Sequence, residues 1–163
     1  MSEKLPIVLG TDPKRTIRLD LLPPLKGAFT VHLHLSEKKD NAHLKLEYGD
    51  TPYCLSLYVF NYPRFLQNRT VRVRSYDLWE KWIMYAARLP DGRPHPKSGG
   101  KLYRPDAVIV GEGSYELENP FISFAYDDGT LLTFRIEFYR YLKYYSPKYG
   151  ESFRSEYWFI GID

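Results

Sequence analysis

The chain has 163 residues, of which 44% are hydrophobic, 17% aromatic and 26% charged. A chain of this length and composition can bury one core, so we expect a single domain over residues 1–163 and exclude a largely disordered protein. Lys and Arg outnumber Asp and Glu by 23 to 20, which is too small an excess to indicate a dedicated nucleic-acid binder.

The cysteine content and the apolar runs bear on where the protein is made. Cys54 is the only cysteine, which rules out an internal disulfide and a zinc site built from several cysteines. The short apolar run at residues 7–9 is too short for the core of a signal peptide, and no run approaches the roughly 20 apolar residues that a membrane helix needs. We therefore expect a cytoplasmic protein that does not bind a membrane.

Alternation of apolar and polar residues begins early in the chain. Residues 16–21 have strand character and end before Pro23 and Pro24. The strongest pattern covers residues 28–48, where two stretches with a two-residue period flank the polar turn 37–40. Successive side chains of a strand point to opposite faces, so this pattern predicts a β-hairpin with one apolar face in the core and one polar face in water.

Three histidines lie on the polar face of this hairpin: His32, His34 and His43. If the turn is centred between residues 38 and 39, His34 lies opposite His43 and His32 lies opposite Lys45. Directly opposed side chains are about 5 Å apart at Cβ, so we expect the three imidazoles to share one patch. We interpret this patch as part of a ligand-binding surface.

A metal site is the alternative use of these histidines. His32 and His34 lie on one strand face, as metal sites on sheets require, and Glu47 is the nearest further ligand. The same spacing occurs on many solvated polar faces, so we assign no metal ligand. The pair followed by Glu37 also resembles the first cupin motif, but no Pro-x-Gly-x-x-His element follows it, and we do not predict cupin chemistry.

Two more strands and one helix are predicted in the middle of the chain. Residues 53–60 and 70–75 have strand character. From 77 to 89, apolar residues recur at steps of three and four, which is typical of a helix. Asp77 with Glu80 resembles a capping box, in which two side chains satisfy the free amides of a helix start.

Residues 90–105 form a long loop with four prolines, three glycines and four basic residues. Loops of this length in compact domains are usually functional or mobile. The loop is positively charged, and a protein-interaction or inhibitor module could act through it.

The last third of the chain predicts several short strands. Asp127-Asp128-Gly129-Thr130 is a strong tight-turn sequence, because Asp-Gly tolerates the positive φ of such turns. Strands are expected at residues 107–110, 114–118, 121–126, 131–139 and 156–162. Short strands with regularly spaced turns predict an all-β fold, an antiparallel β-sandwich or jelly roll with one short helix near 77–89.

The segment 139–149 interleaves tyrosine with lysine and arginine. Such residues stack on bases and neutralise phosphates in proteins that bind single-stranded nucleic acid. They also occur at strand edges, where the ring packs on the core and the hydroxyl meets water. We favour the second interpretation, because the net charge of the chain is only +3.

The segment 57–65 resembles the sugar-binding strand of galectins. Three residues match in type the family pattern His-x-Asn-Pro-Arg-Phe: Asn61, Arg64 and Phe65. Trp79 corresponds to the tryptophan that stacks on galactose, and Glu80 to the carboxylate that orients the arginine. The resemblance covers about 25 residues and implies a β-sandwich lectin, made without a signal peptide and active without a cofactor.

These patterns predict a recognition domain, and we assign no catalytic residue because no nucleophile motif is recognisable. The expected ligand is a glycan or another polar surface, and it is bound without a cofactor by His32, His34, His43, Asn61, Arg64, Arg72, Arg74 and Trp79. Two alternatives stay open: a protein-interaction or inhibitor module that acts through loop 90–105, and a nucleic-acid binder that acts through 139–149.

Overall fold

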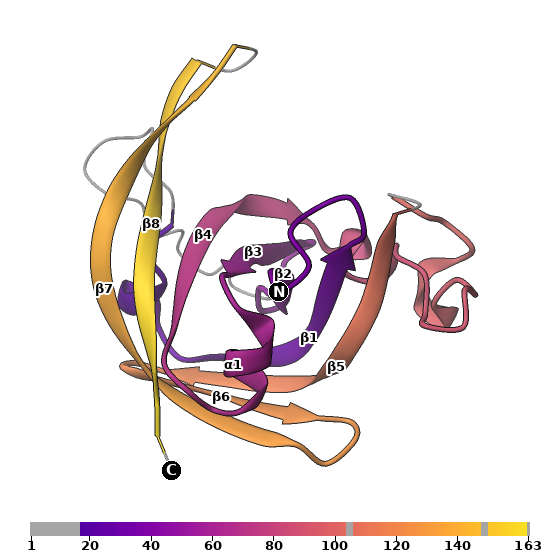
Figure 1. Cartoon of the computed structure of the whole chain (residues 1–163), viewed down its shortest axis with the longest axis horizontal. Helices are drawn as coiled ribbons and strands as arrows, with labels where there is room; N and C mark the ends of the chain where they lie inside the picture. Colours follow the sequence, from indigo (N-terminus) through magenta and orange to yellow (C-terminus); the bar gives the residue numbers. More distant parts are fainter. Residues whose placement is uncertain (1–16, 104–105, 148–149, 163) are drawn as a thin grey trace.

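Antiparallel β-strands that close into a barrel form the body of the protein (Figure 1). The computed structural model describes residues 17–103, 106–147 and 150–162, without the side chains of residues 77, 144, 146, 151 and 152. In this range, eight strands follow one another: β1 (Leu25–His34), β2 (Ala42–Glu47), β3 (Tyr53–Val59), β4 (Val71–Glu80), β5 (Ala107–Glu118), β6 (Phe121–Tyr126), β7 (Leu131–Ser146) and β8 (Gly150–Gly161). Their order around the barrel is β1-β2-β3-β4-β8-β7-β6-β5, and β5 pairs with β1.

The helices of the described residues are short. They are the α-helix α1 (Tyr62–Leu66) and the 3-10 helices η1 (Leu19–Leu21), η2 (Lys81–Tyr85) and η3 (Pro96–Ser98). None of them has the length and hydropathy needed to span a membrane. α1 begins after Asn61, whose side-chain oxygen accepts a hydrogen bond from Arg64 N at 3.2 Å, as a helix N-cap does. The prediction of an all-β protein is therefore confirmed.

The barrel consists of two four-stranded meanders, β1–β4 and β5–β8. They join through two long-range pairings, β1 with β5 and β4 with β8. Because β4 and β5 are not neighbours, the connection between them has to travel along the barrel wall. We call the described part of this connection, residues 81–103 and 106, the crossover segment. Its first part, η2, contacts β1, β2 and β3 from outside the barrel.

Aromatic and aliphatic side chains fill the inside of the barrel. The largest of them are at most 1% exposed and include Phe29, Phe65, Phe124, Phe134 and Phe159. Phe65 comes from α1, which lies across the ring of strands in the view of Figure 1, and its ring centre is 4.8 Å from that of Phe134. The interior of an eight-stranded barrel is just wide enough for side chains to fill. Here it is a packed core.

The hairpin predicted over residues 28–48 is confirmed, but its register differs from the expected one. His32 lies opposite His43, and Thr30 lies opposite Lys45. The chain makes two successive turns after β1, with hydrogen bonds from Glu37 N to His34 O and from Asn41 N to Lys38 O. This longer connection shifts the pairing by two residues, and a shift by two keeps every side chain on its predicted face.

The helix predicted near residues 77–89 is confirmed only in part, as the short 3-10 helix η2. Residues 77–80 complete β4, where Glu80 pairs with Tyr53, and η2 follows directly. Ile83 and Met84 are buried because this segment lies on the outer face of the first meander. The apolar residues at steps of three and four are thus divided between the end of β4, η2 and the residues after it, and do not form the stripe of one helix.

The expected sandwich or jelly roll is replaced by the closed barrel. Alternation within each strand is the same in these architectures, and the pairings that distinguish them join residues far apart in the sequence. The strand predicted at 16–21 is also wrong within the described residues, where η1 forms instead. Leu19 of η1 and Leu22 after it pack into the main core.

Two strands predicted at residues 107–110 and 114–118 are one continuous strand, β5. Glycine usually weakens a strand interior, and often marks a place where another backbone comes close. Gly113 is such a place, because a Cβ there would lie 2.0 Å from Ala125 O on β6. The glycines that interrupt the sequence pattern therefore allow the second meander to pair closely.

Candidate functional site

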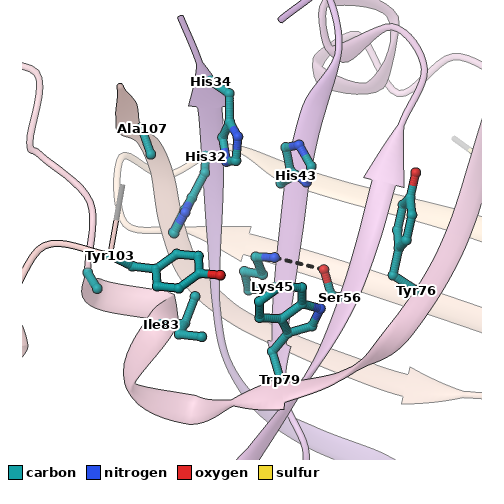
Figure 2. A pocket seen from close by; sticks show the side chains of 11 residues that line it. His32, His34, His43, Lys45, Ser56, Tyr76, Trp79, Ile83, Tyr103 and Ala107 are labelled. Carbon is teal, nitrogen blue, oxygen red and sulfur yellow. Dashed lines mark hydrogen bonds between the residues drawn. The ribbon is translucent and has the colours of Figure 1, made fainter. Parts of the chain in front are cut away.

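The polar face of the first meander becomes a pocket because the crossover segment covers it (Figure 2). Val31 and Leu44 point into the barrel, so His32 and Lys45 point outward. On a bare barrel wall these side chains would meet water, yet His32 is 3% and Lys45 is 6% exposed. The cavity between the sheet and the crossover segment has a volume of about 210 Å³. We call it the outer pocket.

Lys45 lies at the floor of the outer pocket. Its ammonium donates a hydrogen bond to Ser56 Oγ at 2.7 Å and lies 5.4 Å from the centre of the Trp79 ring. Desolvation lowers the pKa of Lys45 to about 8, because burial disfavours the charged form. Among the side chains that the structure describes, no carboxylate forms an ion pair with this ammonium.

His32 ties the crossover segment to the sheet. Its Nε2 lies 2.9 Å from Met84 O and 3.2 Å from Thr30 Oγ1. A carbonyl oxygen can only accept, so Nε2 carries the proton and donates to Met84. Burial, and next the charge of Lys45, lowers the pKa of His32 to about 3, so this imidazole is neutral near pH 7. His32 points away from the core as predicted, but it is covered and holds the pocket wall.

His34 and His43 lie at the end of the outer pocket toward the turn after β1 (Figure 2). Their rings are stacked, with centres 4.1 Å apart and planes at 22°. The carboxylate of Glu37 lies between the two: Oε1 is 2.9 Å from His43 Nε2, and Oε2 is 3.3 Å from His34 Nδ1. Burial, and next Lys45, lowers the pKa of His43 to about 4.

Aromatic rings form the remaining walls. Trp79 at the end of β4 and Tyr103 of the crossover segment have ring centres 5.8 Å apart, with planes at 74°. They are 37% and 46% exposed, and both line the cavity. Figure 2 shows both rings beside Lys45, with Tyr76 farther along β4. A molecule in the outer pocket therefore meets ring surfaces and an ammonium in one small cavity.

Four of the eight residues predicted to bind a ligand line the outer pocket: His32, His34, His43 and Trp79. The first three come from the β1–β2 hairpin, and Trp79 comes from β4. The structure thus brings the histidine patch together with one residue of the galectin-like pattern.

The other four predicted residues have contacts outside the outer pocket. Asn61 caps α1, and Arg64 Nε donates to Thr70 O at 3.2 Å. The guanidinium of Arg72 lies 4.1 Å from the centre of the Phe60 ring. Arg74 pairs with the buried carboxylate of Glu156 at 2.9 Å. These groups stabilise α1 and the outer side of β4, and the sugar-binding arrangement that the sequence suggested is not assembled around them.

Seven of the eleven residues that line the outer pocket were not predicted from the sequence, and three of them have polar side chains at its floor and wall: Lys45, Ser56 and Tyr103. Lys45 alternates in phase with His43, two positions away, so the polar face of the hairpin carried a usable signal. Ser56 lies in a strand that reads as apolar on both faces. Tyr103 belongs to the long loop, whose fold onto the sheet has no local sequence signal.

In each of the two other segments proposed for binding, one arginine forms an ion pair within the chain. In loop 90–105, Arg93 pairs with Asp91 at 2.6 Å, and residues 104–105 lie outside the described residues. In segment 139–149, Arg140 pairs with Glu156 at 2.9 Å, and residues 148–149 lie outside the described residues. The β7–β8 hairpin that carries the second segment extends past the ring of strands in Figure 1.

Comparison with known proteins finds a relative that is similar over almost the whole chain. A protein of Aquifex aeolicus (strain VF5), described as "Uncharacterized protein", is 79% identical over 160 residues, which cover 98% of this chain and 97% of the relative. No family model matches the chain, and no solved structure matches it. The relative's description names no ligand or activity, so a function has to come from the geometry of the site.

Proposed function

The chain belongs to one family with the Aquifex aeolicus protein, and we propose from its own geometry that it is a non-enzymatic recognition domain that binds a single acidic sugar unit in the outer pocket. One observation carries this proposal. A cavity of about 210 Å³ joins partly exposed aromatic rings to a buried ammonium.

The aromatic walls suit the apolar face of a sugar ring. Aromatic side chains offer a large rigid apolar surface with a negative face, against which the C–H groups of a sugar pack. Trp79 and Tyr103 both line the cavity, and their rings lie beside Lys45 (Figure 2). Stacking on one of these rings would orient the sugar and leave its polar substituents toward the floor.

The floor favours an anionic substituent. A buried charge is costly unless it is paired, and a carboxylate that reaches Lys45 would supply the partner. Charge-assisted hydrogen bonds of this kind are about twice as strong as neutral ones. The described surroundings of Lys45 hold Ser56 as a neutral acceptor, which leaves two of the three ammonium protons for a ligand.

The size of the outer pocket limits the ligand to one ring. Pockets for drug-sized ligands measure roughly 300–1,000 Å³, and this cavity is smaller at about 210 Å³. The ligand would be a monosaccharide or the end of a glycan chain. The protein would act without a cofactor in this role, and the expected cytoplasmic location stays a prediction.

A binding assay with simple sugars tests the proposal. Calorimetry on the full chain would compare D-glucuronate and D-galacturonate with D-glucose and D-galactose, which lack the carboxylate. We expect saturable binding of at least one uronate, at least about tenfold tighter than its neutral counterpart, which corresponds to about 1.4 kcal/mol.

Two tryptophans provide a matched pair of variants. Trp79 and Trp158 are 37% and 36% exposed, and Trp158 lies on β8, away from the outer pocket. Trp79→Ala should weaken uronate binding at least about tenfold, and Trp158→Ala should leave it unchanged. Equal effects of the two substitutions, or no binding of any of the four sugars, would overturn the proposed function.

A further inference from the structure

Two imidazoles and one carboxylate converge beside the outer pocket, in a group that the proposed function does not use. His34, Glu37 and His43 each offer one ligand atom, and these atoms all lie within 4.8 Å of one another. We propose that His34, Glu37 and His43 bind one divalent transition-metal ion of the zinc class at this end of the outer pocket.

The distances between the atoms fit an ion. Two ligands of one tetrahedral Zn²⁺, at bonds of about 2.0–2.2 Å, lie roughly 3.3–3.6 Å apart. The contacts from Glu37 to His34 and His43 are 3.3 Å and 2.9 Å. Oε2 of Glu37 makes the first contact and Oε1 the second, so the carboxylate would turn to share one ion. Because the two imidazole planes are stacked at 22°, at least one ring would also rotate until both nitrogens point at the ion.

The hairpin holds the ligands in place before any ion arrives. His34 ends β1, Glu37 follows in the turn, and His43 belongs to β2. The pairing of β1 with β2 fixes the distance between the two strands. The ring of His43 is also packed edge-on against Tyr58, with ring centres 4.9 Å apart. The sheet therefore keeps the two imidazoles adjacent, and binding would need rotation of side chains but no movement of the strands.

The donor set indicates which ions fit. Two imidazole nitrogens and one carboxylate oxygen are the ligands of many catalytic zinc sites and of non-haem iron(II) sites, whereas Ca²⁺ and Mg²⁺ prefer oxygen. Three protein ligands leave at least one position open. His34 and His43 both line the outer pocket, so the open position would face the cavity.

The sequence interpretation considered a metal here with a different ligand set. It grouped His32 with the other histidines and named Glu47 as the nearest further ligand. In the structure, His32 is committed to Met84 O, and a carboxylate oxygen of Glu47 accepts from Ala28 N at 2.9 Å. The carboxylate that reaches the histidines is Glu37, because the double turn after β1 folds it back over the end of the hairpin.

A second histidine–carboxylate pair offers a matched control. His95 Nε2 lies 2.9 Å from Glu112 Oε1, the same distance as in the His43–Glu37 contact. Within the described part of the chain, no third His, Cys, Asp or Glu completes a ligand group with that pair. A contact between one histidine and one carboxylate should not hold an ion tightly, so the two pairs separate a metal site from a plain hydrogen bond.

The test uses the full chain after treatment with a chelator and removal of the chelator. We expect calorimetry with Zn²⁺ to show one saturable site per chain, and titration with Co²⁺ to give the visible absorption of a four- or five-coordinate ion. Loss of an outer-shell partner typically costs 10–100-fold in metal affinity. Glu37→Gln and His43→Gln remove ligands themselves and should cost at least about a hundredfold, whereas Glu112→Gln should change nothing.

The experiment distinguishes failure of the metal-site proposal from failure of the proposed function. Thermal melts without metal show whether the variants are folded, and Co²⁺ absorption of the unaltered chain does not depend on any variant. Zinc binding that is absent, or equal in Glu37→Gln and Glu112→Gln, overturns the metal site. Uronate binding without zinc binding overturns this inference alone, and zinc binding without uronate binding overturns the proposed function alone.

Discussion

The barrel interior and the outer pocket are both buried, but they bury different chemistry. The interior holds rings such as Phe124 and Phe134 that are at most 1% exposed. The outer pocket covers Lys45, which is 6% exposed and has a neutral hydrogen-bond acceptor. Eight-stranded barrels can hold one small ligand inside, yet this interior is filled, and the space for a ligand lies outside the wall.

If the proposed function holds, this difference separates the residues that stabilise the barrel from those that bind the ligand. Burial of apolar side chains is the main favourable contribution to folding, so the interior accounts for the stability of the barrel. Burial of an ammonium opposes folding unless a partner compensates for it. We infer that the crossover segment covers a face that is kept polar for a ligand, and the following predictions test this contrast from the largest effect to the smallest.

Truncation of one interior ring should have the largest effect. Phe134 is fully buried and its ring centre lies 4.8 Å from that of Phe65 and 5.7 Å from that of Phe159. Phe134→Ala should lower the free energy of unfolding by about 3–5 kcal/mol, because it leaves a cavity in the core. Trp79→Ala in the outer pocket should lower it by less than about 2 kcal/mol. Urea unfolding measures both, and equal losses would remove the contrast between the two regions.

The second-largest effect should be a fall in the free energy of unfolding at alkaline pH, caused by buried tyrosines of the interior. Burial raises the pKa of Tyr62 to about 12 and also raises that of Tyr126, whose hydroxyl is hydrogen-bonded to that of Tyr62 at 2.9 Å. The folded pKa lies above the unfolded value of about 10, so this stabilisation is present below pH 10 and is lost as the pH rises toward 12.

The loss for Tyr62 alone is on the order of 2 kcal/mol at the upper end of this range. Unfolding measured from pH 9 to 11.5 should show a steeper decline for the unaltered chain than for Tyr62→Phe. Parallel curves would mean that the hydroxyl pair does not titrate with folding.

The buried carboxylate of Glu156 has charged partners, unlike the buried ammonium of Lys45, so the two can be compared. Glu156 is fully buried and binds Arg74 and Arg140, each at 2.9 Å. Glu156→Gln should lower the free energy of unfolding by about 2 kcal/mol, less than the 3–5 kcal/mol typical of a fully buried pair, since both arginines are partly exposed. Glu137→Gln on the same hairpin is the control at an exposed position and should have no effect. A neutral result for Glu156→Gln would show that this wall does not depend on its ion pairs.

Removal of the ammonium in the outer pocket should have the smallest effect on stability. Burial of a charge without a charged partner is costly, and an apolar side chain of similar shape removes this cost. Lys45→Met should leave the free energy of unfolding unchanged or raise it by up to about 1 kcal/mol, and it should abolish the preference for a uronate over a neutral sugar. A loss of more than about 1 kcal/mol would show that Lys45 serves the fold.

The local part of the structure was predictable from the sequence. A two-residue period from Phe29 to Tyr48 determines which side chains face the core, and this placed His32, His34 and His43 on the outer face. The register was not predictable, because the turns after His34 add residues to the connection. The predicted face of each side chain was still correct, because the register differs by two residues and side chains of a strand alternate every two residues.

The non-local part could not be derived in this way. Closure of the barrel depends on β1–β5 and β4–β8, and the cover of the outer pocket depends on contacts between Met84 and His32, 52 positions apart. Tyr103 reaches the cavity only because the crossover segment takes this path. The residues of the galectin-like pattern do not all lie in one place, because Asn61 caps α1 and Arg74 is bound to Glu156.

Nuclear magnetic resonance of the ¹⁵N-labelled chain during titration with D-glucuronate tests most directly where a ligand binds. Saturable shifts should be confined to the outer pocket: amides of the β1–β3 residues beside Lys45, amides of the crossover segment, and the indole of Trp79. Saturable shifts centred on α1 and on the interior residues of β6 and β7, with the outer pocket unaffected, would contradict the assignment of recognition to the outside of the barrel.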